Sequence, residues 1–293
     1  MKISKAIIWA AGFGTRFLPY TKSVQKEMLP VLARPMIDYV IDDCVKAGVT
    51  EIIIVVNEQN GYQIRSFYSE NSAMHEYLIR MRKPEKYDLL KDIHTKAKFT
   101  FVTQPDNGEY GTAVPLKLAK EHVIKEDAFL VFGGDDFIFN QDGQSEAGRM
   151  IDLFLRSGAD ALVTCMEVSQ DKVNRYGIVE YRAEGDFKYL TNIIEKPSLE
   201  DAPSNLANIS KYIFTPKIFN YLENQQVNPQ SGELYVTDTY KAMAKDCKEV
   251  VYIAEGRYLD CGDPLGWLKT NLTVAMDNPE MKSELVKFMK SSS

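Results

Sequence analysis

Unbroken apolar runs alternate with helical patterns along the first half of the chain. Four runs have no polar alternation, which is typical of strands covered on both faces of a sheet: 5–10, 51–56, 98–103 and 128–134. Between the first two, residues 35–47 place their apolar side chains on one helical stripe, and Gly48 follows as a stop signal. This order predicts parallel strands joined by crossover helices.

The remaining segments extend this pattern. Residues 57–97 are rich in Lys and Glu with helical spacing, which predicts a helical insertion. Candidate strands in the second half are 159–168, 176–181, 189–197 and 207–215, and residues 249–262 read as a closing pair of strands. Helices are expected at 217–224, 233–245 and across most of 264–290.

These elements predict an α/β fold with a Rossmann-like mixed, mostly parallel sheet, extra strands and a C-terminal helical region. We expect one catalytic domain over 1–262, with the insertion at 57–97, and a helical extension over 263–293. The 293 residues bury enough surface to form a core without disulfides or a structural metal. The apolar residues of the extension fit oligomerisation and packing within one subunit equally well.

Composition narrows the class of partner. The net charge of −6 argues against a protein that coats nucleic acid, but it leaves room for phosphorylated small molecules at a local positive site. The four cysteines form no C-x-x-C pair, and the three histidines lie in no nucleophile or zinc motif. The N-terminal apolar run is too short for a membrane span and lacks a signal-peptide layout, so we expect a cytoplasmic protein with no membrane partner.

The candidate chemistry begins with a glycine loop at the carboxyl end of the first strand. Gly12 and Gly14 allow a backbone to approach a phosphate, and consecutive N–H groups can bind the anion. The loop matches neither the dinucleotide fingerprint nor the P-loop, and alone it fits a tight turn equally well. Two prolines farther on stiffen the segment and would hold Lys26 near Arg16, which makes a site for a triphosphate.

Together these motifs carry a resemblance. The stretch A-G-F-G-T-R-F-L-P-Y-T-K followed by K-E-M-L-P-V resembles the signature of the bacterial UTP–glucose-1-phosphate uridylyltransferases, within the sugar-1-phosphate nucleotidyltransferases. The resemblance continues through the G-G-D-D at 133–136, Glu195-Lys196-Pro197 and Asp260-Cys261-Gly262. It implies Mg²⁺ as cofactor, UTP and glucose 1-phosphate as substrates, UDP-glucose and pyrophosphate as products, and a homo-oligomer, either a dimer or a tetramer.

The resemblance also implies roles for individual residues. Arg16 and Lys26 would be catalytic, and Asp135 and Asp260 would bind the metal. The expected nucleotide-binding residues are Ala11, Gly12, Gly14, Thr15, Gln104 and Gly111, and the expected sugar-phosphate-binding residues are Gly177, Glu195 and Lys196.

Elementary chemistry agrees with these roles. Carboxylates suit Mg²⁺, which commonly takes one or two of them together with substrate phosphates. A sugar phosphate oxygen is already an anionic nucleophile at neutral pH, so the reaction needs no general base. The barrier is charge repulsion, which Mg²⁺, Arg16 and Lys26 would offset while holding an in-line geometry. Asp136 is expected to orient Asp135 rather than to bind metal.

Several positions depart from the family pattern. Trp9 and Gln25 stand where prolines are usual, which would make the loop before Lys26 less rigid. Glu109 and Thr112 change the segment near the base, and Ser210-Lys211 replace a glycine-arginine pair near the expected sugar pocket. These changes leave open another hexose 1-phosphate or dTTP as substrate. A metal-dependent glycosyltransferase and a non-catalytic nucleotide-sugar-binding paralogue are the alternative functions.

Overall fold

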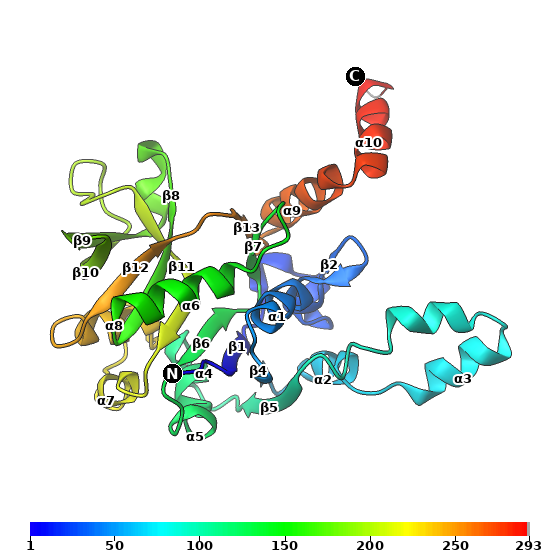
Figure 1. The fold of residues 1–293 in the computed structure, drawn as a ribbon, viewed down its shortest axis with the longest axis horizontal. Coiled ribbons are helices and arrows are strands. Elements are labelled where there is room, and N and C mark those ends of the chain that lie inside the picture. The colour runs from blue at the N-terminus through cyan, green and yellow to red at the C-terminus, as the bar shows by residue number, and fades with distance from the viewer. Residues whose placement is uncertain (292–293) are drawn as a thin grey trace.

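A nine-stranded sheet forms the centre of the molecule (Figure 1). The computed structural model describes residues 1–291. The strand order is β5-β4-β1-β6-β11-β8-β12-β10-β9. In that order the strands span Lys98–Gln104, Glu51–Asn57, Lys5–Ala10, Phe129–Gly133, Leu206–Phe214, Ala161–Glu167, Glu249–Ile253, Phe187–Glu195 and Gly177–Glu184.

Parallel and antiparallel pairs are divided unevenly across this sheet. The first four strands, β5, β4, β1 and β6, are all parallel, as the sequence predicts. Beyond them only β8 and β12 pair in parallel, whereas β11 runs antiparallel to both β6 and β8 and the hairpin β9–β10 adds further antiparallel pairs. The mixed sheet is therefore confirmed, but its mostly parallel character holds only for the N-terminal part. In the rest of the sheet the hairpin β9–β10 needs no crossover helix, whereas α7 (Ile218–Leu222) and α8 (Val236–Met243) connect β11 to β12.

Helices cover both faces and separate two clusters of buried side chains. On one face α1 (Met36–Lys46) and α6 (Glu146–Ser157) pack against the sheet. On the other face lie α4 (Ala113–Leu118), α5 (Lys120–Val123), α7 (Ile218–Leu222) and α8 (Val236–Met243). The sequence pattern predicted α1, α7 and α8 but not α4, α5 or α6.

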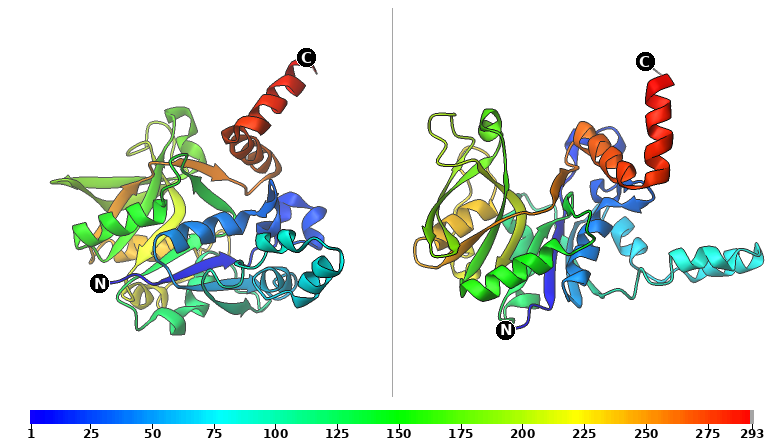
Figure 2. Two further views of the ribbon diagram at one scale, coloured as in Figure 1. Left: turned by 45° about the vertical axis from the view of Figure 1, so that its right-hand side comes forward. Right: turned by 45° about the horizontal axis from the view of Figure 1, so that its top comes forward.

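Residues 57–97 extend from the edge of the sheet as an arm, drawn in cyan (Figures 1 and 2). The arm contains α2 (Tyr62–Phe67), α3 (Ser72–Arg80) and the 3₁₀ segment η4 (Pro84–Leu89), so this segment is helical as expected. Gly61 lets α2 begin directly at the end of β4, because a Cβ there would lie 2.5 Å from the carbonyl oxygen of Asn57.

A separate two-stranded ribbon is formed by β7 (Asp136–Phe139) and β13 (Arg257–Asp260). The expectation that 249–262 forms a closing pair of strands is wrong. β12 lies between β8 and β10 in the main sheet, so both its edges are occupied, and β13 leaves to pair antiparallel with β7. In this register Asp260 lies opposite Asp136.

The C-terminal region forms two helices with a break at Asn278, α9 (Pro264–Asp277) and α10 (Pro279–Ser291). α9 contacts the hairpin of β2 (Pro30–Val31) and β3 (Arg34–Pro35): Trp267 Nε1 donates to the carbonyl oxygen of Pro30 at 2.8 Å. This part of the extension therefore packs within the subunit, whereas α10 has no buried residue. None of the helices within residues 1–291 is long and apolar enough to cross a membrane.

Candidate active site

The glycine loop follows β1 directly and leaves its backbone donors available. Gly14 has a φ of +64°, and a Cβ there would lie 3.0 Å from Lys26 Cβ and from Thr21 Cγ2, so both the conformation and the space require glycine. The N–H groups of Gly12, Phe13 and Gly14 donate to no acceptor within residues 1–291. Thr15 begins a short 3₁₀ turn and is exposed. The loop therefore presents consecutive free donors of the kind that bind phosphate.

Lys26 lies across this loop and joins it to the end of β6. Its Nζ is 2.5 Å from Asp135 Oδ2, although the two residues are 109 positions apart in the chain. A Cβ on Gly12 would lie 3.6 Å from the same Nζ. The prediction that Lys26 lies near the glycine loop is thus correct in position.

Arg16, Asp135 and Asp260 converge around Gly262. A Cβ on Gly262 would lie 2.9 Å from Asp260 Oδ1, 3.1 Å from Arg16 NH1 and 3.9 Å from Asp135 Oδ2. Arg16 NH1 also donates to the carbonyl oxygen of Gly262 at 3.3 Å. Residues from three distant parts of the sequence therefore meet at one point.

The charges in this cluster shift one another's ionisation. Burial opposes ionisation of Asp135, but the charge of Lys26 and its hydrogen bond outweigh burial and lower the pKa of the carboxyl. Burial likewise opposes the charge of Lys26, yet Asp135 and Glu27 raise its pKa above the usual value. Burial raises the pKa of Asp260, and the negative Asp135 adds to that rise against a hydrogen bond from the Gly262 amide. An added cation beside the two aspartates would relieve this repulsion.

A buried ion pair holds Asp136 away from this cluster. Lys211 Nζ donates to the carboxylate and the carbonyl oxygen of Asp136 and to the carbonyl oxygen of Gly133 at 3.3 Å. Tyr258 Oη donates to the other carboxylate oxygen of Asp136 at 2.8 Å. Asp136 is therefore fully engaged, as expected of a residue that orients its neighbour. The sequence analysis singled out Lys211 as a departure near the sugar pocket, but not its ion pair with Asp136, because a lysine within a strand is more often on the surface.

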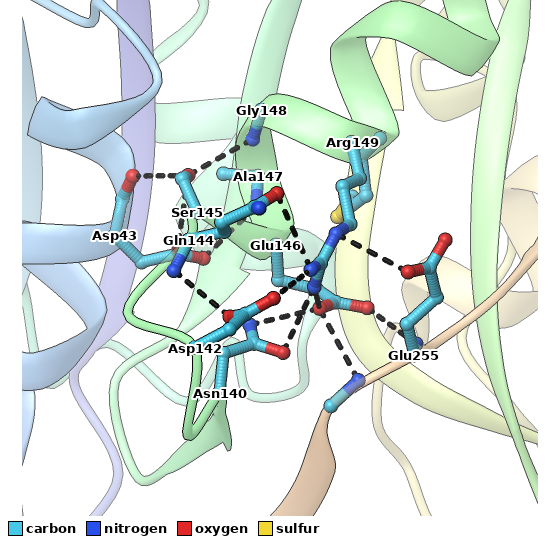
Figure 3. Close-up of polar contacts among 12 residues, drawn as sticks. Asp43, Asn140, Asp142, Gln144, Ser145, Glu146, Ala147, Gly148, Arg149 and Glu255 are labelled. Carbon is cyan, nitrogen blue, oxygen red and sulfur yellow. Dashed lines mark hydrogen bonds and ion pairs between the residues drawn. The ribbon is translucent and has the colours of Figure 1, made fainter.

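The far end of the ribbon β7–β13 is anchored by the buried carboxylate of Glu146 (Figure 3). Glu146 accepts hydrogen bonds from Tyr252 Oη, the backbone N–H groups of Glu255 and Gly256, and the Asn140 side chain, at 2.7–3.3 Å. Arg149 donates to Glu146 and Asn140 and pairs with Glu255 and Asp142. This network fixes the strands that carry Asp136 and Asp260 at their opposite ends.

The residues present fit a divalent metal. Asp135 Oδ1 and Asp260 Oδ2 accept no hydrogen bond within residues 1–291, and both carboxylates have burial and mutual repulsion that a cation would offset. In that part of the chain no three His, Cys, Asp or Glu side chains group into a full metal cage. Two carboxylates with open positions suit an ion such as Mg²⁺, which takes its remaining ligands from substrate phosphates and water.

A narrow cleft beside the glycine loop has the groups needed to bind a base. Ala11, Phe13, Gln104 and Tyr110 all line it. The rings of Phe13 and Tyr110 are 6.2 Å apart, and both side chains are partly exposed. Gln104 Oε1 is buried without a hydrogen-bond partner, so an acceptor is available for a ligand donor. The sequence prediction named Ala11 and Gln104 but missed the two aromatic residues, although Phe13 lies between the loop glycines.

The other expected base-site residues have close structural partners. Gly111 has a φ of +117°, and a Cβ there would lie 2.1 Å from the carbonyl oxygen of Leu234, so the segment before α8 packs directly on this glycine. Thr112 Oγ1 accepts a hydrogen bond from the N–H of Val236, the first residue of α8. Glu109 pairs with Lys117 at 3.0 Å. The two departures from the family pattern at Glu109 and Thr112 therefore stabilise local structure.

The three expected sugar-phosphate residues lie together at the end of the hairpin β9–β10. Gly177 is opposite Glu195 in the register, and a Cβ on Gly177 would lie 3.0 Å from Glu195 Oε2. Lys196 has a φ of +47°, a backbone conformation that costs energy for a residue with a side chain. Its Nζ is 3.9 Å from Glu195 Oε1, and both side chains are about two-thirds exposed, at 64% and 66%. No direct contact joins this group to the cluster around Asp135 within residues 1–291.

Tyr212 lies between the two groups. Burial raises the pKa of its hydroxyl, Asn208 lowers it through a hydrogen bond, and the charges of Asp136 and Glu195 raise it again. Its ring is 6.1 Å from that of Trp9. A Cβ on Gly133 would lie 3.2 Å from Trp9 Nε1 and 3.0 Å from Ser210 Cβ, so the departures at Trp9 and Ser210 line the space beside Asp135.

Comparison with known proteins identifies the family to which this chain belongs. A family model described as nucleotidyl transferase matches residues 5–276. The UTP–glucose-1-phosphate uridylyltransferase of Bacillus subtilis (strain 168) is 34% identical over 290 residues, which covers 99% of this chain and 97% of that protein. The chain belongs to the nucleotidyl transferase family, and within it to the UTP–glucose-1-phosphate uridylyltransferases.

Solved structures of this family have the same fold. A UTP-bound UGPase from Acinetobacter baumannii is 32% identical with a TM-score of 0.85, and the match covers 98% of this chain and 99% of that one. A UDP-glucose pyrophosphorylase complexed with UDP-glucose is 28% identical with a TM-score of 0.81, covering 94% of this chain and 100% of that one. The resemblance expected from the sequence is confirmed. Family membership decides against the glycosyltransferase alternative.

Proposed function

We propose that this chain transfers the uridylyl group of UTP to glucose 1-phosphate with the help of Mg²⁺, giving UDP-glucose and pyrophosphate. The observation that carries the proposal is the convergence of Arg16, Lys26, Asp135 and Asp260 beside a loop with free N–H donors. Cations, carboxylates and unpaired amides at one point suit a metal-bound triphosphate. The relatives, which include structures with UTP and with UDP-glucose bound, support the same substrates.

In this mechanism the nucleotide is held first by the N-terminal strands. The cleft with Phe13, Tyr110 and Gln104 would bind the uracil ring, with the unpaired Gln104 Oε1 accepting from its N–H. The amides of Gly12 and Gly14 would bind the phosphates, with Thr15 and the backbone of Gly111 beside them. These contacts orient the α-phosphorus toward the sugar side.

The transfer step is the in-line attack of a sugar phosphate oxygen on that phosphorus. Arg16 and Lys26 would offset the charge on the reacting phosphate and on the leaving pyrophosphate. Asp135 and Asp260 would hold Mg²⁺, which supplies further positive charge against the triphosphate. Lys196 would bind the phosphate of the sugar, Glu195 its hydroxyls, and Gly177 would leave room for the ring.

We also propose the coarser arrangement implied by the resemblance. Residues 1–262 would form the catalytic domain with the arm at 57–97 as an insertion, and 263–293 would form an extension. The enzyme would act in the cytoplasm as a homo-oligomer, a dimer or tetramer, on small molecules rather than on nucleic acid or membranes. Light scattering of the purified full chain measures the subunit number, and a monomeric mass would contradict that part.

A pyrophosphate-release assay tests the function. Purified protein is incubated with Mg²⁺ and each of UTP, dTTP, CTP and ATP against the 1-phosphates of glucose, galactose and N-acetylglucosamine. The proposal predicts the highest kcat/KM for UTP with glucose 1-phosphate. A better rate with another pair would reassign the substrate. Background turnover together with UDP-glucose binding would instead identify a non-catalytic paralogue.

A further inference from the structure

The turn that precedes Lys26 is fixed by a buried amide rather than by a proline ring. Gln25 is 1% exposed. Its Nε2 donates to the carbonyl oxygen of Ala10 at 2.8 Å and to Glu27 Oε2 at 2.6 Å, and its carbonyl oxygen accepts from the N–H of Met28 at 2.9 Å. The loop is therefore tied to the end of β1 on one side and to the residues around Lys26 on the other. These hydrogen bonds restrain the turn without a proline ring, whereas the lower rigidity expected from the sequence stays a prediction.

Gln25 Nε2 also donates to the carbonyl oxygen of Gly12 at 3.4 Å, and further hydrogen bonds come from the arm and the strand that leads into it. Asn57, the last residue of β4, donates from Nδ2 to Gln25 Oε1 at 2.6 Å. Gln63 in α2 accepts from the N–H of Gln25 at 2.7 Å and donates to the carbonyl oxygen of Ser23 at 2.6 Å. Gln63 thus bonds to backbone groups of both residues 23 and 25. Both groups lie within its reach only in this conformation of the turn.

The backbone dihedral angles of Gln25 would also suit a proline. Hydrogen bonds and a proline ring are therefore two ways to restrain the same conformation. Gln25 has φ −62° and ψ 129°, which a proline can adopt without strain. A proline there would lack the N–H that Gln63 accepts and the side-chain amide that binds Ala10 and Glu27. In this chain the side chains of residues 57 and 63 therefore take part in setting the turn, although they are more than 30 residues away.

We propose that Gln25, Asn57 and Gln63, here called the amide cluster, are positioning residues that hold Lys26 against the glycine loop and Asp135. The inference rests on the proposed role of Lys26 in nucleotidyl transfer. Gln63 touches neither the glycine loop nor Asp135, so it acts through Gln25 and Ser23. The arm consequently controls the transfer step without contributing a group to it.

A double-mutant cycle with Gln63→Ala and Gln25→Pro tests the amide cluster. Each single variant should lower kcat about tenfold, because small displacements of a catalytic group are costly. The KM for glucose 1-phosphate should stay within twofold, since Glu195 and Lys196 lie elsewhere. The double variant should lose clearly less than the hundredfold product of the single losses, because Gln25→Pro already removes the N–H that Gln63 accepts and leaves only its bond to Ser23.

Arg65→Ala is the matched control. Arg65 lies in the same helix but bonds outward to Thr103 of β5 at 2.6 Å, so its removal loosens α2 without touching the turn. It should keep the wild-type kcat. An equal loss in Arg65→Ala, or losses that multiply in the double variant, would overturn the inference and leave a general effect of α2 on stability.

A conservative variant covers the case in which Gln63→Ala folds poorly. Gln63→Glu keeps an acceptor for the N–H of Gln25 but loses the donor to the carbonyl oxygen of Ser23, so its kcat should lie between those of the wild type and Gln63→Ala at equal thermal stability. A kcat as low as that of the alanine variant would contradict the inference. An inactive wild-type protein would refute the proposed function itself, whereas an active wild type with unaffected variants would refute only the positioning role.

Discussion

The two halves of the site differ in how far their side chains are buried and bonded to one another before any substrate is present. The nucleotide half comprises β5, β4, β1, β6 and the ribbon β7–β13, and the sugar half comprises β11, β8, β12, β10 and β9. In the nucleotide half Lys26 and Asp135 are bonded to each other, with side chains 18% and 24% exposed. In the sugar half Glu195 and Lys196 stand about two-thirds exposed and 3.9 Å apart.

One buried polar atom without a partner belongs to the nucleotide half: Gln104 Oε1, at the position where a base would bind. The difference in exposure and pairing between Lys26–Asp135 and Glu195–Lys196 indicates that the catalytic groups of the nucleotide half are preorganised, whereas contacts in the sugar half are completed by the substrate.

The largest expected effect is on the preorganised half. Asp135→Asn removes the partner of Lys26 and a metal ligand, and should lower kcat about 10²- to 10³-fold, or ~3–4 kcal/mol. Pyrophosphate release at saturating substrates measures the change. Asp142→Asn is the matched control, because Asp142 is exposed and pairs with Arg149 at the far end of the ribbon. A rate within twofold of wild type for Asp135→Asn would remove that residue from the mechanism.

In the sugar half the loss should fall on binding. Lys196→Met should raise the KM for glucose 1-phosphate about tenfold, or ~1.4 kcal/mol, because an exposed cation contributes less than a buried one. The KM for UTP should not change. Lys172→Met, at an exposed lysine just before β9, serves as the control. Equal changes in both KM values would show that the two halves are not separate.

A change at Gln104, which is proposed to bind the base, should alter the preference between nucleotides, with an effect smaller than that at Asp135. Gln104→Leu removes the unpaired acceptor and should raise the KM for UTP about five- to tenfold, or ~1–1.4 kcal/mol, while CTP is affected less. Initial rates with both nucleotides measure the ratio of their kcat/KM values. Gln226→Leu, at an exposed glutamine beyond α7, is the comparison variant. An unchanged preference for UTP would assign base selection to other groups in the cleft.

The smallest effect is on stability and concerns Glu249. Burial raises its pKa well above 4.5, and Asp160 adds to the rise. The folded protein therefore favours the protonated carboxyl, so this group stabilises the fold below pH 4.5 and the contribution is lost as pH rises toward the folded pKa, at up to ~1.4 kcal/mol per pH unit. Glu249→Gln should be more stable than wild type at pH 8, with a difference that shrinks toward pH 5.

Urea unfolding at several pH values measures that difference. Parallel curves for Glu249→Gln and wild type would mean that the wild-type carboxyl is ionised and has found a partner. Activity should be unchanged, because Glu249 begins β12 and neither of its carboxylate oxygens bonds to a group assigned to the transfer.

The sequence predicted the nucleotide half better than the sugar half, and the reason is physical. Buried parallel strands have unbroken apolar runs, and their carboxyl ends meet at one edge of a sheet, so the proximity of the glycine loop to Asp135 followed from the pattern. The strand that pairs with β13 could not be predicted, because a strand of four residues with mixed burial has no pattern that identifies its neighbour.

Side-chain hydrogen bonds between distant residues also could not be predicted from the sequence. Gln25 looked like the loss of a rigid proline, since its partners Asn57 and Gln63 lie far along the chain. Lys211 was expected near the sugar pocket, since only the fold shows that it is buried against Asp136. In both cases the bonds of the residue depend on tertiary contacts.

The proposed mechanism requires Asp135 and Asp260 to share one metal ion. The most direct measurement is the Mg²⁺ dependence of UDP-glucose formation at saturating UTP and glucose 1-phosphate in the Asp260→Asn variant. We expect the half-saturating Mg²⁺ concentration to rise about tenfold, because one of two carboxylate ligands is lost. A half-saturating concentration equal to that of the wild type would contradict it.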